Sequence, residues 1–183
     1  AEKAKARKLA QQISTDPAIL KDCELVIIAL PLKELLQPSL GLIEALPPAA
    51  AITDVGSVKE PVLKIWSKLH QNFVASHPMA GTAKSGVEAG QKDLFRNRPW
   101  VCTPDQNTNP KSLQIIKELA VALGSRWITT EAKKHDEAVA LISHLPVIVS
   151  AALLRTLGEE NDDEIQALAK NLASSGFADT SRI

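Results

Sequence analysis

Aromatic residues are scarce in this sequence: six of its 183 residues are phenylalanine or tryptophan, and none is tyrosine. Proteins that bind single-stranded nucleic acid stack its bases on aromatic side chains, so the composition does not favour that mode of binding. An excess of one charge is missing as well, because 21 lysines and arginines balance 21 aspartates and glutamates. The chain therefore has no net charge to attract nucleic acid or an anionic membrane surface. Since no apolar run approaches the ~20 residues that span a bilayer, we expect neither kind of partner.

Cysteine is also rare, and only Cys23 and Cys102 are present. Each adjoins or lies within an expected strand, so we expect buried free thiols, which suit a reducing cytoplasm. The four histidines have neither the spacing nor the carboxylate neighbours of a metal site. Residues 1–13 are charged and amphipathic, unlike a signal peptide. These features predict a cytoplasmic protein without a metal.

A glycine-rich nucleotide fingerprint is the third feature that the sequence lacks. A doubly wound nucleotide-binding domain usually begins with a strand, a Gly-x-Gly-x-x-Gly turn and a helix, and none of these opens this chain. Residues 1–13 carry apolar positions at helical spacing, so we expect the chain to begin inside a helix. The chain is accordingly expected to be a piece of a longer protein.

Strands and helices alternate up to about Thr130. Short apolar runs rich in branched residues predict strands at 24–30, 49–53, 73–76, 100–103 and 126–129. Apolar positions three and four apart predict helices at 32–43, restarted or kinked at Pro38, at 58–69, and at 110–123. The first strand is nearly all apolar, as expected of a strand covered on both faces. This order indicates an α/β fold with a partial doubly wound, Rossmann-like and mainly parallel sheet.

After residue 130 the sequence predicts helices alone, at 132–143, 146–157 and 162–175, the last stopping at Gly176. We therefore place a domain boundary near Thr130, with an α/β domain over 1–130 and the start of an all-helical domain over 131–183. The apolar positions of these helices are numerous, so we expect this segment to associate with a partner surface.

His77 is the most informative residue. It follows the expected strand 73–76 and precedes a turn at 78–81. Parallel sheets bind their ligands where strands end, and an imidazole can exchange a proton near neutral pH. The alternative is a histidine that only ties down a loop.

Ser57 lies after another expected strand, at the start of a helix. The segment 57–60 fits a capping box, in which the serine hydroxyl satisfies a free backbone amide. The same place is also the crevice at the strand ends, so a functional role is compatible with a cap. Asp54 is expected to hold the turn, and Lys59 is expected in solvent.

Further along, His144 lies beside Pro146 at an expected break between helices, where a histidine usually caps carbonyl groups. His135 and Asp136 are expected to be structural. Arg182 has no local helix partner, and an arginine is suited to binding a carboxylate through two parallel hydrogen bonds.

Four segments match a known family in order and spacing. They are Thr53-Asp54-Val55-Gly56-Ser57-Val58-Lys59, His77-Pro78-Met79-Ala80-Gly81-Thr82, Ser143-His144-Leu145-Pro146, and Ser175-Gly176-Phe177-x-Asp179-Thr180-Ser181-Arg182. On these segments the chain resembles the TyrA family, the prephenate and arogenate dehydrogenases of tyrosine biosynthesis. The resemblance extends from residue 1 to residue 183, and it is closest to the cyanobacterial arogenate dehydrogenases.

The resemblance implies a dinucleotide-binding domain over 1–130, lacking its first strand, glycine-rich turn and helix. Over 131–183 it implies the beginning of a helical substrate and dimerisation domain, and hence a homodimer of the full-length protein. It also implies the reaction. The hydrogen on ring C4 of a small cyclohexadienyl substrate leaves as hydride to NAD(P), and the ring carboxylate leaves as carbon dioxide.

Roles follow from motif position. His77 looks like the residue that hydrogen-bonds the substrate 4-hydroxyl and polarises it, and Ser57 looks like the neighbour that orients His77 and contacts the nicotinamide. The resemblance further suggests substrate-binding residues, His144, Arg182 and Thr82, and cofactor-facing turns, Leu30-Pro31 and Val55-Gly56.

Two departures bear on the substrate. Many prephenate-preferring members have a histidine where this chain has Val147, and some have an acidic residue where it has Ala83. Both changes remove polar groups, so we expect arogenate, with prephenate as the alternative. The cyanobacterial likeness implies NADP, with NAD possible. Two other hypotheses are a non-catalytic α/β module that serves as an assembly or binding partner, and a hydroxyacid-type dehydrogenase. The first is suggested by the missing glycine fingerprint, without which this piece alone is not expected to bind a dinucleotide. The latter enzymes use a catalytic lysine and lack the His-Pro-x-x-Gly element.

Overall fold

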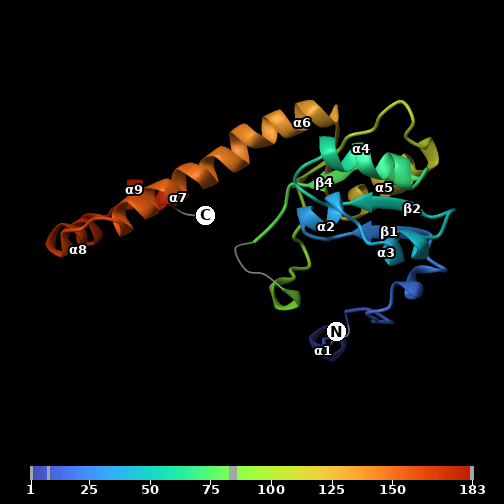
Figure 1. The fold of residues 1–183 in the computed structure, drawn as a ribbon, viewed down its shortest axis with the longest axis horizontal. Coiled ribbons are helices and arrows are strands. Elements are labelled where there is room, and N and C mark those ends of the chain that lie inside the picture. The colour runs from blue at the N-terminus through green and yellow to red at the C-terminus, as the bar shows by residue number, and fades with distance from the viewer. Residues whose placement is uncertain (1, 8, 83–85, 182–183) are drawn as a thin grey trace. The chain divides into compact units, whose positions relative to one another are not determined.

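The computed structural model describes residues 2–7, 9–82 and 86–181 (Figure 1). The chain divides into two compact units, Ala1–Asp136 and Glu137–Ile183. The first unit contains the strands, and the second is helical.

Two sets of three short strands build the first unit. The first set is parallel, in the order β1 (Leu25–Ile28), β2 (Ala51–Asp54), β3 (Phe73–Val74). The second set has the order β4 (Ser76–Pro78), β5 (Pro99–Cys102), β6 (Arg126–Thr129). In it, β4 is antiparallel to β5, while β5 and β6 are parallel. The mainly parallel α/β sheet is therefore as predicted.

The segment 73–78 belongs to both sets, because Ala75 alone separates β3 from β4. The sequence predicted one strand at 73–76 and a turn from Pro78, and these bounds are wrong. His77 and Pro78 instead lie in β4, where they pair with Val101 and Trp100. The candidate histidine is therefore held by the sheet itself.

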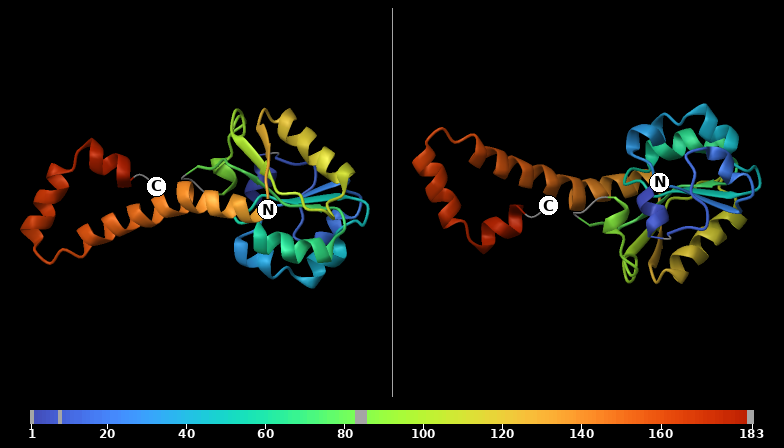
Figure 2. Two further views of the ribbon diagram at one scale, coloured as in Figure 1. Left: turned by 90° about the horizontal axis from the view of Figure 1, so that it is seen from above. Right: turned by 90° about the horizontal axis from the view of Figure 1, so that it is seen from below.

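Helices cover both faces of the strands (Figure 2). One face carries α2 (Leu32–Leu36), α3 (Leu40–Ala45) and α4 (Glu60–Leu69), and the other carries α5 (Pro110–Ala122). Successive strand residues point to opposite faces, so each face has its own core. The first core includes Val26, Ile28, Leu35, Ile52, Val62 and Trp66, and the second includes Val74, Cys102 and Ile116.

Local sequence signals explain the helix ends. The restart expected at Pro38 is confirmed: α3 begins after Ser39, whose hydroxyl accepts a hydrogen bond from the Leu42 amide at 3.3 Å. The expected helix at Pro110 is confirmed as α5. Asn109 caps its first turn, and Gly124 follows its end with φ of 75°, a left-handed conformation that favours glycine.

The beginning of the chain differs from the expectation. Instead of a helix over 1–13, the structure has α1 (Glu2–Ala6), irregular backbone over residues 9–16 and a short 3₁₀ turn, η1 (Pro17–Leu20). Leu9 is exposed, and a short helix without packing is marginal in water. The strand expected to be covered on both faces is also only half covered. In β1, Ile27 is 44% exposed, because α5 packs on β2 and β3.

A long helix begins in the last residues of the first unit and continues into the second. α6 (Ala132–Val139), the π-helical segment η3 (Ala140–His144) and α7 (Leu145–Gly158) form one run of 27 residues. The predicted break beside Pro146 is therefore wrong. A proline inside a helix lacks one amide and crowds the preceding turn, and the wider π turn just before it accommodates that crowding.

Two shorter helices complete this unit, α8 (Asp163–Leu172) and α9 (Ser175–Ser181). Asp162 caps α8 by accepting hydrogen bonds from the amides of Glu164 and Ile165. Gly176 was predicted to end a helix, but it lies in the first turn of α9 instead. A second short 3₁₀ turn, η2 (Val87–Ala89), belongs to the first unit.

The 27-residue helix is strongly apolar. Its most apolar window has a mean hydropathy of 1.9, and only 11% of that window is buried. The sequence-based statement that no segment approaches a bilayer span is thus wrong by length and composition for this helix. Exposed apolar side chains include Leu141, Ile142, Leu145 and Ile148. A helix with such a surface needs an apolar partner, and a second protein surface meets that need as well as a lipid does.

Candidate functional site

His77 lies at the centre of β4. Its strand neighbours Ser76 and Pro78 are buried, while His77 itself is half-buried, as the alternation of side chains along a strand allows. Its Nδ1 atom lies 2.9 Å from Nε2 of His135, and the two rings meet edge to face with centroids 5.1 Å apart. A histidine on the sheet is therefore supported by a histidine in the first turn of α6.

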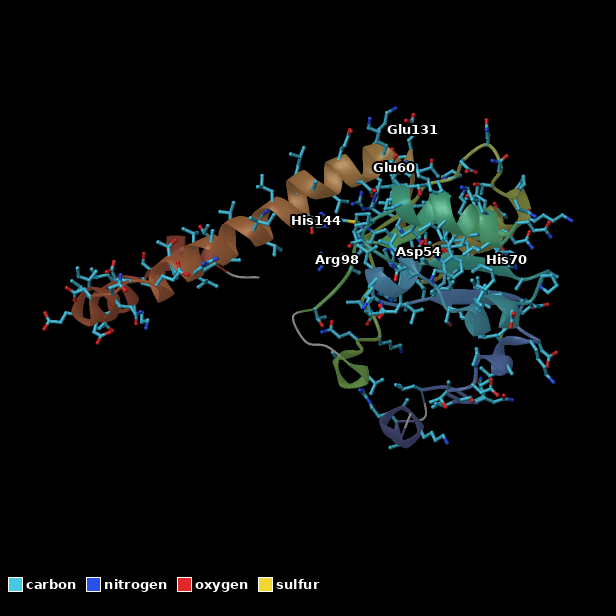
Figure 3. All side chains as sticks on the ribbon, in the orientation of Figure 1. Asp54, Glu60, His70, Arg98, Glu131 and His144 are labelled. Carbon is cyan, nitrogen blue, oxygen red and sulfur yellow. The ribbon has the colours of Figure 1, made fainter. Side chains whose placement is uncertain are left out.

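The support continues to Asp136. His135 is almost completely buried, and its Nδ1 atom lies 2.7 Å from Oδ1 of Asp136. The amides of Lys59 and Glu60 donate hydrogen bonds to the Asp136 carboxylate, at 2.7 and 2.8 Å. Glu60 opens α4 and Glu131 immediately precedes α6; both are labelled in Figure 3. The chain of contacts thus runs from β4 through α6 to the start of α4.

Asp136 also replaces the predicted helix cap. The capping box at Ser57 is wrong, because Ser57 is exposed and α4 begins at Glu60 without a cap from the residue before it. Burial by itself raises the pKa of Asp136. The hydrogen bonds from the Glu60 amide, His135 and the Lys59 amide lower this pKa by a larger amount, so the net shift is downward. A carboxylate at a helix N-terminus is also favoured by the helix dipole.

A buried ion pair contacts the first residue of β4. Lys59, which was expected in solvent, is completely buried, and its ammonium contacts the carboxylate of Asp54. It also donates a hydrogen bond of 2.7 Å to the carbonyl of Ser76, next to His77. Asp54 accepts hydrogen bonds from the amides of Gly56 and Ser76, at 2.9 and 3.2 Å. Asp54 therefore holds its turn, as expected, and also anchors the neighbouring strand.

Burial governs the electrostatics of this pair. Loss of water raises the pKa of Asp54 and lowers the pKa of Lys59, and the attraction between the two groups opposes both shifts. Removing one partner of a buried pair leaves an uncompensated charge, which costs about 3–5 kcal/mol. The pair consequently fixes the end of β2 against the start of β4.

The expected cofactor-facing turns lie close together. The amide of Val55 donates a hydrogen bond of 3.3 Å to the carbonyl of Ile28, at the carboxyl ends of β1 and β2. Leu30, Pro31 and Ser57 beyond these ends are exposed. At Gly56, an added Cβ would lie 2.8 Å from Cδ1 of Leu35, so a larger residue there would have to displace the Leu35 side chain.

The cysteines and the possible metal ligands do not add a second candidate site among the described residues. Cys23 and Cys102 are both free thiols, but only Cys102 is buried as expected, whereas Cys23 is half-buried. Burial raises the pKa of Cys102 to about 12. Among the residues that the structure describes, no group of three or more histidine, cysteine or acidic side chains could hold a metal ion.

Comparisons with known proteins identify the family. The model of the prephenate dehydrogenase nucleotide-binding domain matches residues 1–129, and that of the prephenate dehydrogenase dimerization domain matches residues 131–183. The chain belongs to the prephenate dehydrogenase family. The membership expected from the four motifs is thereby confirmed, together with the Rossmann-like fold of the first domain.

The chain matches only part of the length of each curated relative in this family. The chain is 33% identical to the prephenate dehydrogenase of Bacillus subtilis, over 90% of this chain and 45% of that protein. It is 31% identical to the cyclohexadienyl dehydrogenase of Zymomonas mobilis, over 84% of this chain and 53% of that protein. The chain thus spans about half the length of the curated relatives it matches.

Two solved structures of family members resemble the whole chain. Synechocystis arogenate dehydrogenase is 40% identical, with a TM-score of 0.75, over 99% of this chain and 65% of that one. Prephenate dehydrogenase from Aquifex aeolicus, in complex with hydroxyphenyl propionate and NAD+, is 28% identical, with a TM-score of 0.89, over 99% and 64%.

The remaining motif residues of this family member are distributed over both units. Thr82 is exposed in the first unit, after β4. His144 ends the π-helical segment in the second unit, where it is half-buried (Figure 3). Ala83 and Arg182 lie outside the described residues. The structure therefore groups His77 with His135 and Asp136, residues that the sequence had indicated only as structural.

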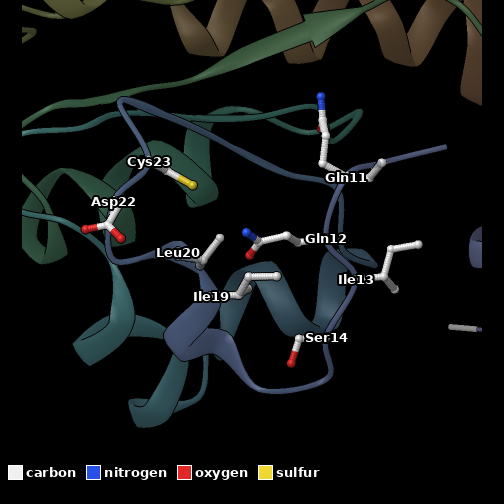
Figure 4. A pocket seen from close by; sticks show the side chains of 9 residues that line it. Gln11, Gln12, Ile13, Ser14, Ile19, Leu20, Asp22 and Cys23 are labelled. Atoms are coloured by element: carbon white, nitrogen blue, oxygen red, sulfur yellow. The ribbon is translucent and has the colours of Figure 1, made fainter. Parts of the chain in front are cut away.

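A separate hollow of about 620 Å³ lies near the beginning of the chain (Figure 4). It is lined by residues 10–14 together with Ile19, Leu20, Asp22 and Cys23. Its wall contains no residue of the four family motifs, so the hollow is distinct from the candidate site around His77.

Proposed function

We propose that the complete protein containing this chain oxidises arogenate to tyrosine with NADP, releasing carbon dioxide. The hydride leaves ring C4, and the electron pair of the broken carboxylate bond completes the aromatic ring. The nearest alternative is the same reaction of prephenate with NAD.

The observation that carries this proposal is the support of His77. A half-buried imidazole on a strand is braced by the buried ring of His135, which is itself held by Asp136. A braced imidazole can accept a hydrogen bond from the substrate 4-hydroxyl and take up its proton as the hydride departs. The proton returns when the aromatic product forms. Such acid–base assistance typically contributes 10² to 10⁴ in rate.

The strand ends fit the nicotinamide half of a cofactor. The turns after β1 and β2 meet at the Val55–Ile28 hydrogen bond and expose Leu30, Pro31 and Ser57. An apolar rim with one hydroxyl suits a flat ring and its amide. The described residues contain no glycine-rich phosphate turn, so the pyrophosphate half is assigned to no residue of this chain. When bound, the cofactor supplies the hydride acceptor, and Ser57 is proposed to orient the nicotinamide and His77.

Substrate recognition is assigned by motif. We assign Arg182 to the side-chain carboxylate of the substrate, and His144 and Thr82 to the wall of its pocket. Val147 and Ala83 stand where prephenate-preferring members have polar groups, which favours arogenate. The 40% identity to Synechocystis arogenate dehydrogenase points the same way. NADP is proposed only from the cyanobacterial likeness of the four motifs.

The full-length protein is proposed to be a cytoplasmic homodimer. Residues 131–183 match the family's dimerization domain. The apolar side chains exposed along α7 provide a surface for a second copy.

Cofactor reduction by the complete protein tests the proposal. Arogenate and prephenate are each offered with NADP+ and with NAD+, and kcat/KM is measured for the four combinations. The proposal predicts the highest value for arogenate with NADP+. A higher value for prephenate with NAD+ would establish the alternative, and no reduction in any combination would overturn the dehydrogenase assignment.

A further inference from the structure

We propose that His135 and Asp136 are positioning residues that keep His77 in the tautomer with hydrogen on Nδ1. In this tautomer Nε2 is the accepting nitrogen, as the proposed function requires for a substrate hydroxyl. The role of Nε2 rests on that proposed function, whereas the tautomer is a property of the folded protein alone.

The direction of the hydrogen bonds begins at Asp136. Its two oxygens accept from the amides of Lys59 and Glu60, at 2.7 and 2.8 Å. Amides can only donate, so they favour an ionised carboxylate, which can only accept. His135 lies 2.7 Å from the same carboxylate through Nδ1. The hydrogen of this bond must therefore belong to Nδ1 of His135.

The direction then passes to His77. A neutral imidazole with hydrogen on Nδ1 has an accepting lone pair on Nε2. In His135 this Nε2 lies 2.9 Å from Nδ1 of His77. Since one of the two nitrogens must donate, the hydrogen belongs to Nδ1 of His77. The lone pair of the His77 ring is thereby assigned to Nε2.

The same arrangement suits a proton transfer. When His77 takes up a proton on Nε2, its Nδ1–H bond to His135 becomes charge-assisted and hence stronger. His135 is 3% exposed, so little water competes for this bond. An aspartate that orients a catalytic histidine in serine proteases acts by the same logic, although there the contact is direct.

A second histidine of the first unit provides an internal contrast. His70 accepts a hydrogen bond from the amide of Asn72 through Nδ1, at 3.2 Å, and its Nε2 lies 3.1 Å from the carbonyl of Pro47. A carbonyl only accepts, so His70 is assigned the opposite tautomer, with hydrogen on Nε2. The fold thus predicts two different tautomers for two histidines of one unit.

Nitrogen NMR of the complete protein with ¹⁵N-labelled histidine tests the tautomers directly. The spectra are recorded above the usual histidine pKa of about 6.5, and His77→Gln and His70→Gln variants assign the signals. We expect hydrogen on Nδ1 of His77 and on Nε2 of His70. Hydrogen on Nε2 of His77 would overturn the proposal, whatever the enzyme's activity.

Two substitutions of His135 separate positioning from folding. In His135→Gln the side-chain oxygen can still accept from Nδ1 of His77, whereas in His135→Asn the shorter amide reaches Asp136 but leaves His77 unsupported. We expect kcat to fall about 10 to 10²-fold in His135→Asn, with little change in KM, and much less in His135→Gln. His70→Asn is the control and should keep the wild-type kcat.

Equal losses of kcat in both His135 variants, in proportion to lost thermal stability, would reduce His135 to a structural role and overturn the proposal. If the wild-type protein reduces neither cofactor with either substrate, the proposed function fails by itself. The NMR result then decides the tautomer alone.

Discussion

At the scale of single residues, His77 offers the sharpest test of the chemistry. His77→Asn keeps a polar side chain of similar reach to Nδ1 but removes the proton-accepting nitrogen. In the complete protein we expect kcat to fall by about 10² or more, while the Kd for the cofactor stays nearly unchanged. Steady-state kinetics and a cofactor titration measure the two quantities. An unaltered kcat would remove His77 from the mechanism.

Lys59 provides a test of stability at the same scale. Lys59→Met leaves Asp54 as an uncompensated buried charge, so we expect the free energy of unfolding to fall by about 3–5 kcal/mol. Denaturant unfolding measures it, and an added Asp54→Asn change should restore part of the loss. Lys64→Met is the matched control, because Lys64 forms an exposed pair with Glu60, and such pairs contribute about 0–1 kcal/mol. Similar losses in both variants would contradict a buried pair.

The sequence indicated some of these residues and missed others. His77 and Ser57 could be selected because each belongs to a short family motif, although the structure places His77 at the centre of β4 and not at the end of a strand. The buried position of Lys59 could not be predicted in this way. It depends on contacts with Asp54 and with the Ser76 carbonyl, which come together only when β2 and β4 are in place. His135 and Asp136 contact residues more than 50 positions away, and no local pattern reports such a contact.

At the scale of elements, two glycines in different conformations predict opposite effects. Gly124 ends α5 with φ of 75°, so Gly124→Ala should lower the free energy of unfolding by about 1–2 kcal/mol. Gly41 lies inside α3, where an added Cβ would meet nothing within 4 Å. Gly41→Ala should therefore raise stability, by about 0.5–1 kcal/mol. Thermal unfolding compares the stability of the two variants. If both substitutions destabilise the protein, the helical position with free space around it that we assign to Gly41 is wrong.

The hydrogen bonds between the start of α4 and the Asp136 carboxylate predict that the stability of the fold depends on pH in the acid range. The folded-state pKa of Asp136 lies below its usual value, so its contribution to stability is complete above about pH 4 and is lost as the pH falls through the folded-state pKa. Wild type should therefore be more stable than Asp136→Asn at neutral pH, and the difference should shrink below pH ~4. Urea unfolding across this range measures the difference. A gap that widens in acid would contradict the downward shift.

Elements with strong local signals were predictable, and those set by packing were not. Apolar runs and a proline–glycine frame located β1, β2, β6 and α5. The helix expected over 1–13 does not form along its whole length, because Ala6, Leu9 and Ala10 are exposed and no packing stabilises them in a helix. The break expected at Pro146 fails because a π turn absorbs the proline, and the spacing of apolar residues does not reveal such a turn.

At the scale of the whole molecule, the change from alternating elements to helices alone marks the start of a different unit. The sequence placed this change near Thr130. The family models meet between residues 129 and 131, and the compact units meet between Asp136 and Glu137. The difference arises because His135 and Asp136, which lie within α6, make their contacts with the sheet domain. A helix that begins in one unit and continues into the next has no boundary that sequence texture alone can locate.

The exposed face of that helix leads to a prediction about assembly. Ile148 on α7 is 64% exposed in the single chain, and a proposed homodimer would cover it. Ile148→Glu would then place a charge in an apolar interface, so we expect the dimer Kd to rise about 10²-fold or more, equivalent to about 3 kcal/mol. Sedimentation of the complete protein over a range of concentrations measures this Kd. Arg155→Ala is the control on the same helix, because Arg155 forms an exposed pair with Glu159. An unchanged Kd in Ile148→Glu would exclude this face from the dimer interface.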